Sequence, residues 1–180
     1  PRIDYTSGEA VILVEPQRTN LFLNSEPTAN EGPAGGVTYA SFSWAIGFNN
    51  AVIFADNSIT RFRYGATAVN AVVNTISFFV IMDDLSTPVV GNNTTTGDFS
   101  LVIAGVQNVG VNGSLIIKNY GNNIFKISAN HTPNGGSLGN NGIVKFSTQS
   151  AKGFRLVGLQ LEVGINSTSY IPTVAASVTR

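Results

Sequence analysis

The chain is a series of short apolar segments, about five to eight residues each, separated by turns rich in Asn and Gly. Turns such as Asn112–Gly113 and Gly121–Asn122–Asn123 suit hairpins, because Asn and Gly tolerate a positive φ angle. No segment of ten or more residues carries apolar side chains at the helical spacing of about 3.6. This pattern predicts an all-β fold and disfavours parallel βαβ units.

Several segments alternate apolar and polar residues, as a strand with one buried face requires. Phe99, Leu101 and Ile103 share one such face, and Leu159 and Leu161 share another. About ten short strands of this kind predict an antiparallel β-sandwich. Strands are expected over residues 10–14, 37–46, 51–54, 59–64, 76–82, 99–103, 114–118, 124–129, 144–146 and 154–161.

Length and charge restrict the possible partners. With 180 residues and no break in composition, residues 1–180 are expected to form a single domain. Ten Lys and Arg balance ten Asp and Glu, so no net field attracts nucleic acid. No apolar run reaches the roughly 18 residues that predict a membrane span, so no membrane insertion is expected. Because the chain starts at Pro1 without an initiator Met, we expect a processed chain or an excised module.

The two ends carry the most distinctive motifs. Residues 1–5 read PRIDY, residues 13–21 read LVEPQRTNL and residues 24–26 read NSE; near the other end stand GLQLEVG at 158–164, TSYIPT at 168–173 and ASVTR at 176–180. These ends resemble the opening and closing segments of modules in phage and prophage tail proteins of the receptor-binding or tail-fibre type. The middle is similar to carbohydrate-binding jelly rolls attached to polysaccharide hydrolases.

The resemblance implies a jelly-roll β-sandwich that is located in a virion tail or outside the cell. Its implied partners are a polysaccharide or cell-surface glycan and other segments of a tail protein, with a homotrimer as one option. Where the relatives have Trp or Tyr followed by Arg after a Gly–Asn turn, this chain has Phe125 and Lys126.

Terminal arms are expected at about residues 1–26 and 162–180. Pro16 and Pro172 fix φ and lack a donor, so both arms should be extended rather than helical. Apolar residues in the arms need a surface to cover, and the sandwich body or a neighbouring subunit would supply it. Arg18 has Glu15 and Glu162 as candidate partners for a bidentate pair; the alternative is an exposed polar pair of little energetic value.

The sequence lacks the residues that catalysis needs. His131 is the single histidine and there is no cysteine, so neither a nucleophilic triad nor a zinc site can be assembled. The adjacent Asp83 and Asp84 point to opposite faces if they lie on a strand, which does not suit a glycosidase pair. We therefore expect a protein that is not an enzyme.

A structural calcium ion is the one cofactor that the resemblance implies, held by backbone carbonyls and one or two carboxylates. Asp83, Asp84 and Asp98 are the candidate ligands, and solvated turn carboxylates are the alternative reading. No other cofactor is expected.

Glycan binding requires an aromatic ring for the apolar face of a sugar and polar donors for its hydroxyl groups. Trp44 has a second interpretation as a core residue, because it alternates in step with Phe42 and Ile46. The candidate ligand-binding residues are Trp44, Arg61, Arg63, Tyr64, Tyr120 and Asn122.

Three functions follow as hypotheses. The first is a non-catalytic glycan-binding or adhesion module of a phage-type tail or receptor-binding protein, which takes part in host recognition. The second is a structural module that joins or trimerises tail-protein segments without a ligand. The third is a binding appendage of a polysaccharide-degrading enzyme.

Overall fold

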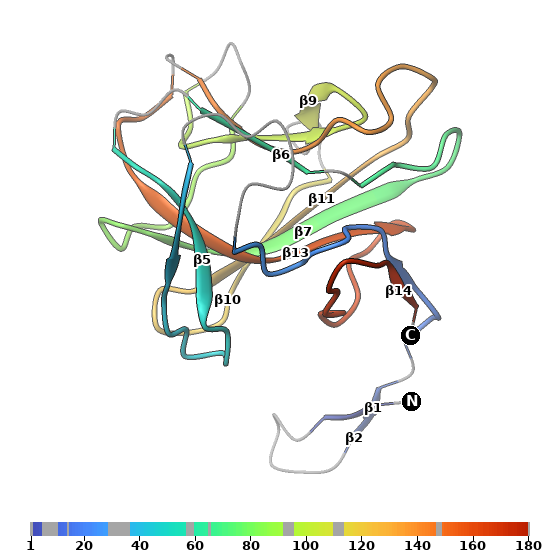
Figure 1. Ribbon diagram of the computed structural model, residues 1–180, viewed down its shortest axis with the longest axis horizontal. Coiled ribbons are helices and arrows are strands. Elements are labelled where there is room, and N and C mark those ends of the chain that lie inside the picture. The colour runs from blue at the N-terminus through green and yellow to red at the C-terminus, as the bar shows by residue number, and fades with distance from the viewer. Residues whose placement is uncertain are drawn as a thin grey trace.

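The chain folds into strands and turns. The computed structural model describes residues 2–4, 11–13, 15–28, 37–56, 60–64, 66–91, 96–109, 114–146 and 149–179, and these residues contain no helix. The described residues therefore include no helix long and apolar enough to cross a membrane. Two antiparallel sheets face each other as a β-sandwich (Figure 1), which confirms the all-β class predicted from the sequence.

Nine of the ten strands expected from the sequence lie in the two sheets of the sandwich, and the one expected over 10–14 is β2 (Val11–Leu13), which lies outside them. From edge to edge, the six-stranded sheet contains β10 (Ile116–Asn119), β11 (Phe125–His131), β7 (Asn74–Met82), β13 (Phe154–Val163), β5 (Asn50–Phe54) and β4 (Thr38–Ser41). The four-stranded sheet contains β6 (Thr60–Tyr64), β12 (Asn141–Lys145), β8 (Ser100–Ile103) and β9 (Val106–Val109).

Two short strand pairs lie in the terminal segments. β3 (Thr19–Asn20) pairs with β14 (Val178–Thr179), which brings the two arms side by side. β1 (Arg2–Asp4) and β2 (Val11–Leu13) form a separate hairpin that lies outside the sandwich in Figure 1. The sequence pattern did not predict β9, because its residues Val106–Gln107–Asn108–Val109 are half polar.

The main core fills the space between the two sheets. Phe78, Val80 and Met82 of β7 point into it, as strand alternation requires. The ring of Phe154 stacks on Phe54 at a centroid distance of 4.4 Å and contacts Phe99 at 4.7 Å. Phe54 and Phe154 belong to the six-stranded sheet and Phe99 immediately precedes β8 of the four-stranded sheet, so the three rings tie the two layers together.

Strand β13 changes register at Gly158. Phe154 and Leu156 face the main core before this point, and Leu159 and Leu161 face it afterwards. An extra residue must therefore be accommodated, and the pairing with β7 shows a bulge between Val157 and Gln160. Gly158 has a φ angle of +66°, which glycine adopts at little cost.

A second apolar cluster covers the outer face of the six-stranded sheet. It includes Phe79, Ile81 and Val157, so β7 is buried on both faces. Trp44 and Phe48 cover this cluster from the segment 42–49, which is a turn closed by bonds from Phe42 N–H to Asn49 O and from Trp44 N–H to Phe48 O. The strand predicted over 37–46 therefore ends at Ser41, because the chain folds back onto the sheet.

Candidate functional site

The two sequence motifs at the chain ends contact each other on the body of the sandwich. The Asn20 side-chain amide donates to Leu159 O at 3.0 Å and to Ile171 O at 2.9 Å, while its Oδ1 accepts from the N–H groups of Phe22 and Leu161. Asn20 is fully buried, and all four bonds replace hydration lost on burial. It therefore connects the N-terminal arm, β13 and the C-terminal arm.

Buried Gln160 and Glu162 fix the C-terminal arm to the outer face of β13. Gln160 Oε1 accepts from Ile171 N–H at 2.7 Å, and Glu162 accepts from both the N–H and the hydroxyl of Thr168. Arg18 forms no ion pair with Glu15 or Glu162; its guanidinium packs over Gly164 instead, and its buried Nε has no hydrogen-bond partner. The bidentate pair, one of the two interpretations of Arg18, is therefore not formed.

The fixed arm forms one wall of a surface groove of about 330 Å³. The floor is the outward face of β10 and β11, where Ile116, Lys118, Lys126 and Ser128 lie. Residues 166–169 and Glu15 form a wall of the groove, which Tyr120 also lines. The groove thus brings together the sandwich and both terminal arms.

Tyr120 presents the main aromatic surface of this groove. Its side chain is 43% exposed, and its ring packs edge-on against Phe79 at a centroid distance of 5.4 Å. Phe79 belongs to the outer cluster and is nearly buried, so the Tyr120 ring rests on a rigid support. A partly exposed, well-supported ring of this kind suits stacking against an apolar ligand face.

Two lysines lie beside Tyr120. Lys118 Nζ is 5.1 Å from the Tyr120 ring centroid, and Lys126 Nζ is 5.8 Å from that of Phe79, both in cation–π range. Lys126 also donates to Thr168 O at 2.8 Å. Burial lowers the pKa of Lys126, Glu162 and Glu15 raise it in part, and Lys118 lowers it further.

The wall of the groove supplies hydroxyl and amide groups. Glu15 accepts from the N–H and the hydroxyl of Ser169 at 2.9 and 2.8 Å. Thr168 is held by Glu162, and Asn130 anchors the adjoining turn by donating to Ile165 O at 2.9 Å. The groove is thus lined by one ring, two ammonium groups, a carboxylate and several hydroxyls.

The candidate ligand-binding residues predicted from the sequence do not all lie together in the structure. Tyr120 lies in the groove, and Asn122 lies in the adjoining turn with a φ angle of +51° but does not line the groove. Trp44 is only 3% exposed and donates from Nε1 to Asn50 O, so it is a core residue rather than a ligand platform. Arg61 is exposed on β6 of the other sheet.

Two further candidates, Arg63 and Tyr64, have side chains outside the described residues. Their backbones pair with Gly142 and Asn141 in the four-stranded sheet, away from Tyr120 in the other sheet. Arg61, Arg63 and Tyr64 therefore do not share a strand or a sheet with the groove.

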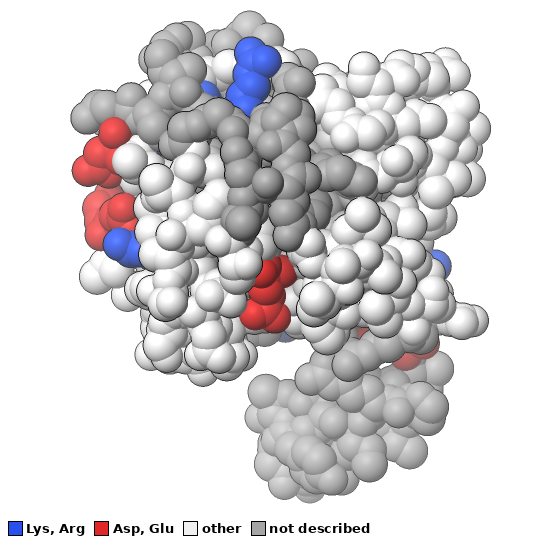
Figure 2. Space-filling view, in the orientation of Figure 1, with Lys and Arg blue, Asp and Glu red and all other residues white. Residues whose placement is uncertain are grey.

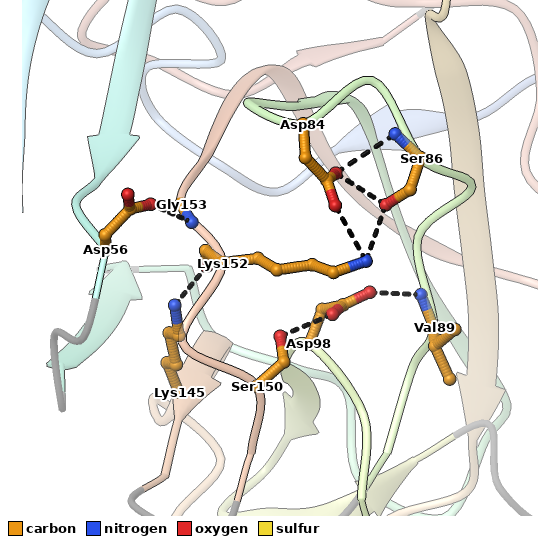
Figure 3. Close-up of polar contacts among 9 residues, drawn as sticks. All are labelled: Asp56, Asp84, Ser86, Val89, Asp98, Lys145, Ser150, Lys152 and Gly153. Carbon is orange, nitrogen blue, oxygen red and sulfur yellow. Dashed lines mark hydrogen bonds and ion pairs between the residues drawn. The ribbon is translucent and has the colours of Figure 1, made fainter.

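The predicted calcium ligands each have partners within the protein, and Figure 3 shows those of Asp84 and Asp98. Asp84 accepts from Ser86 and pairs with Lys152 at 2.9 Å; these interactions lower the pKa of Asp84 to about 2. Asp98 accepts from Val89 N–H and the Ser150 hydroxyl. Asp83 pairs with Arg155 at 2.6 Å. In the part of the chain that the structure describes, no three His, Cys, Asp or Glu side chains converge as a metal site.

Sequence reasoning missed Lys118, Lys126, Glu15 and the segment 166–169 as site residues. Lys118 and Lys126 are direct register partners across β10 and β11, a relationship set by the turn at 120–124. The available signal was the Lys–x–Tyr pattern of 118–120 followed by a Gly–Asn–Asn turn and Lys126. The wall of the groove depends on how the arm folds back, for which the sequence pattern gave no signal.

The sequence of the chain was compared with protein-family models and with curated proteins. No protein-family model matches it, and no curated protein matches it. Figure 2 shows the charged atoms of the described residues in only a few small groups on the face it presents. The lysine pair in the groove is thus a local feature of a chain with no net charge.

Proposed function

We propose that the chain is a non-catalytic glycan-binding module and that the sugar binds in the groove over β10 and β11. The observation that carries this proposal is the exposed Tyr120 ring, supported by Phe79 and surrounded by the polar groups of Lys118, Lys126 and Ser167–Ser169. A sugar stacks its C–H face on an aromatic ring, and its hydroxyls bond to such side chains.

The strand connections support the jelly-roll reading. β5 pairs with β13, β6 with β12, β7 with β11 and β8 with β9, and successive pairs alternate between the two sheets. We infer that the chain follows a long two-stranded ribbon wrapped into two Greek keys, the arrangement of a jelly roll. The motif resemblance at both ends favours a tail or receptor-binding protein of phage type, in a virion or outside the cell.

A glycan array followed by calorimetry with the retained polysaccharide tests the site. We expect Tyr120→Ala to weaken binding about tenfold or more, because the stacking platform is lost. Arg61→Ala is the matched control on the other sheet and should bind as the wild type does. No retention on any polysaccharide, or full affinity in Tyr120→Ala, would contradict the proposal.

The non-catalytic part of the proposal needs its own measurement. Incubation of the retained polysaccharide with the protein should release no new reducing ends over many hours. A steady increase of reducing ends, abolished by Glu15→Gln, would instead indicate a glycosidase.

A second candidate function is joining to a further copy of the chain through the arms. The specific observation is that the arms expose large apolar side chains: Val174 is 85% exposed and Ile165 is 64% exposed. Light scattering coupled to size exclusion tests it. A trimer or dimer that Val174→Asp dissociates supports this function, and a monomer at all concentrations contradicts it.

A further inference from the structure

The lysine pair in the groove is placed at an energetic cost. Lys118 and Lys126 are direct partners in the β10–β11 register and their side chains lie on the same outward face. Like charges directly opposite each other on adjacent strands destabilise a sheet. Burial lowers the pKa of Lys126, Glu162 and Glu15 raise it, and Lys118 lowers it by a smaller amount, which is consistent with the proximity of the two lysines.

No carboxylate among the described residues neutralises this pair by direct contact. The two ion pairs found there join Lys152 to Asp84 and Arg155 to Asp83, and none of these four residues lines the groove. Glu15 and Glu162, the acidic groups near the groove, direct their oxygens to Ser169, Thr168 and Gln160. Two ammonium groups thus face the groove without an ion-pair partner in the described part of the chain.

The hydrogen bonds of Lys126 leave capacity for a ligand. An ammonium group has three donors, and the protein acceptor found for Lys126 is Thr168 O. Lys118 is exposed beside the Tyr120 ring. An anion between them would accept from both lysines and relieve their mutual repulsion.

We propose that the ligand of the groove is an anionic glycan, whose ring stacks on Tyr120 while its carboxylate or sulfate group lies between Lys118 and Lys126. This inference rests on the proposed glycan-binding function. The shared chemistry is a negative group on a sugar, and the probes below separate the carboxylate source from the sulfate source.

Two matched pairs of probes test the proposal by affinity electrophoresis and calorimetry: polygalacturonate beside its fully methyl-esterified form, and dextran sulfate beside dextran. We expect at least one charged probe to bind about tenfold or more tightly than its neutral form. Retention of polygalacturonate alone assigns a carboxylate, and retention of dextran sulfate alone assigns a sulfate.

Variants connect the charge preference to the groove. Lys118→Gln and Lys126→Gln should each weaken binding of the charged probe about fivefold to tenfold and reduce its salt dependence. Lys152→Gln removes one positive charge from outside the groove and is the control for non-specific attraction. Equal losses in all three variants, or no loss in the two groove variants, would overturn the proposal.

The design separates failure of this inference from failure of glycan binding itself. If a neutral probe binds as well as its charged form and Tyr120→Ala abolishes that binding, the groove is a glycan site but the anionic preference is wrong. If no probe binds and the glycan array is also blank, both proposals fall.

Discussion

Glu162 holds Thr168 through two hydrogen bonds: Oε2 accepts from the backbone N–H at 3.1 Å, and Oε1 accepts from the hydroxyl at 2.5 Å. Glu162 is fully buried at the end of β13, whereas Thr168 lies in the arm that forms the groove wall. The stability of the arm and the shape of the candidate site therefore depend on the same carboxylate.

Glu162→Gln should destabilise the fold by about 1–3 kcal/mol, because a buried amide cannot accept at both positions and one donor of the arm loses its acceptor. Urea denaturation measures the change in the free energy of unfolding. Glu15→Gln is the matched control: Glu15 is exposed and uses one oxygen for Ser169, so its replacement should change stability by less than about 0.5 kcal/mol. Equal effects of the two replacements would contradict the role given to Glu162.

Gly158→Ala should destabilise the protein by about 3 kcal/mol. An added Cβ would lie 2.9 Å from Phe79 Cδ2 and 3.1 Å from Phe48 Cζ, in addition to the strain of a positive φ angle. Gly121→Ala isolates the strain, because Gly121 has a φ angle of +83° and open space around it; about 1 kcal/mol is expected. Thermal unfolding of both variants gives the comparison, and a smaller effect at Gly158 would refute the packing argument.

Lys145→Met should stabilise the protein by about 1 kcal/mol at pH 7. Lys145 is 1% exposed, and burial lowers its pKa despite the attraction of Asp56, Asp98 and Asp83. Between this lowered pKa and 10.5, the unfolded state binds more protons than the folded state, so wild-type stability rises with pH. The advantage of the variant should therefore shrink as pH increases through this window.

Lys152→Met removes a lysine whose pKa is shifted in the opposite direction from that of Lys145, so the variant should respond to pH in the opposite way. Hydrogen bonding to Asp84 raises the pKa of Lys152, so its contribution is present at neutral pH and is lost as pH rises beyond 10.5. Figure 3 shows the two lysines close together, which makes the comparison a local one. A Lys145→Met protein that is less stable than the wild type at pH 7 would mean that attraction to the three aspartates, together with the hydrogen bond from Lys145 to Lys152 O, outweighs burial.

Tyr170→Phe should cost about 1 kcal/mol at pH 7, because the Tyr170 hydroxyl bonds with Ser25 Oγ and Glu26 Oε1. Burial raises the pKa of Tyr170. Above about pH 10 the unfolded tyrosine loses its proton while the folded one retains it, so stability falls as pH rises. The difference between wild type and Tyr170→Phe, followed by urea denaturation from pH 9 to 11.5, should diminish; a constant difference would exclude this origin.

Much of the sandwich could be predicted from residue alternation, and the bulge in β13 had a readable signal. Phe154 and Leu156 are apolar at even positions and Leu159 and Leu161 at odd ones, so one residue near Gly158 must be extra. The alternation failed at 37–46, since the segment that follows Ser41 leaves the sheet and packs Trp44 on its outer face. The alternation pattern of Trp44 is the same whether the residue lies on a continued strand or on a segment that has left the sheet, so the sequence does not distinguish the two.

The candidate site was predicted only at Tyr120. Lys118 and Lys126 become neighbours through the register of the β10–β11 hairpin, and the wall depends on contacts between segments that are more than a hundred residues apart in sequence, such as Glu15 and Ser169. Local patterns do not determine such contacts. The motifs at the two ends did mark the buried polar residues, since Asn20, Gln160 and Glu162 all lie within them.

The pairing of β3 with β14 places Thr19 beside Thr179, with their hydroxyls 2.5 Å apart. A short linker from residue 179 to residue 19, with residues 1–18 removed, would therefore close the remaining chain into a ring with no rearrangement of the sandwich. New termini opened in the exposed turn at Gly121–Asn123 would then give a circular permutant. In that molecule the pairing of β3 with β14 becomes a hairpin closed by a short loop, so it would no longer depend on contact between segments about 160 residues apart in sequence.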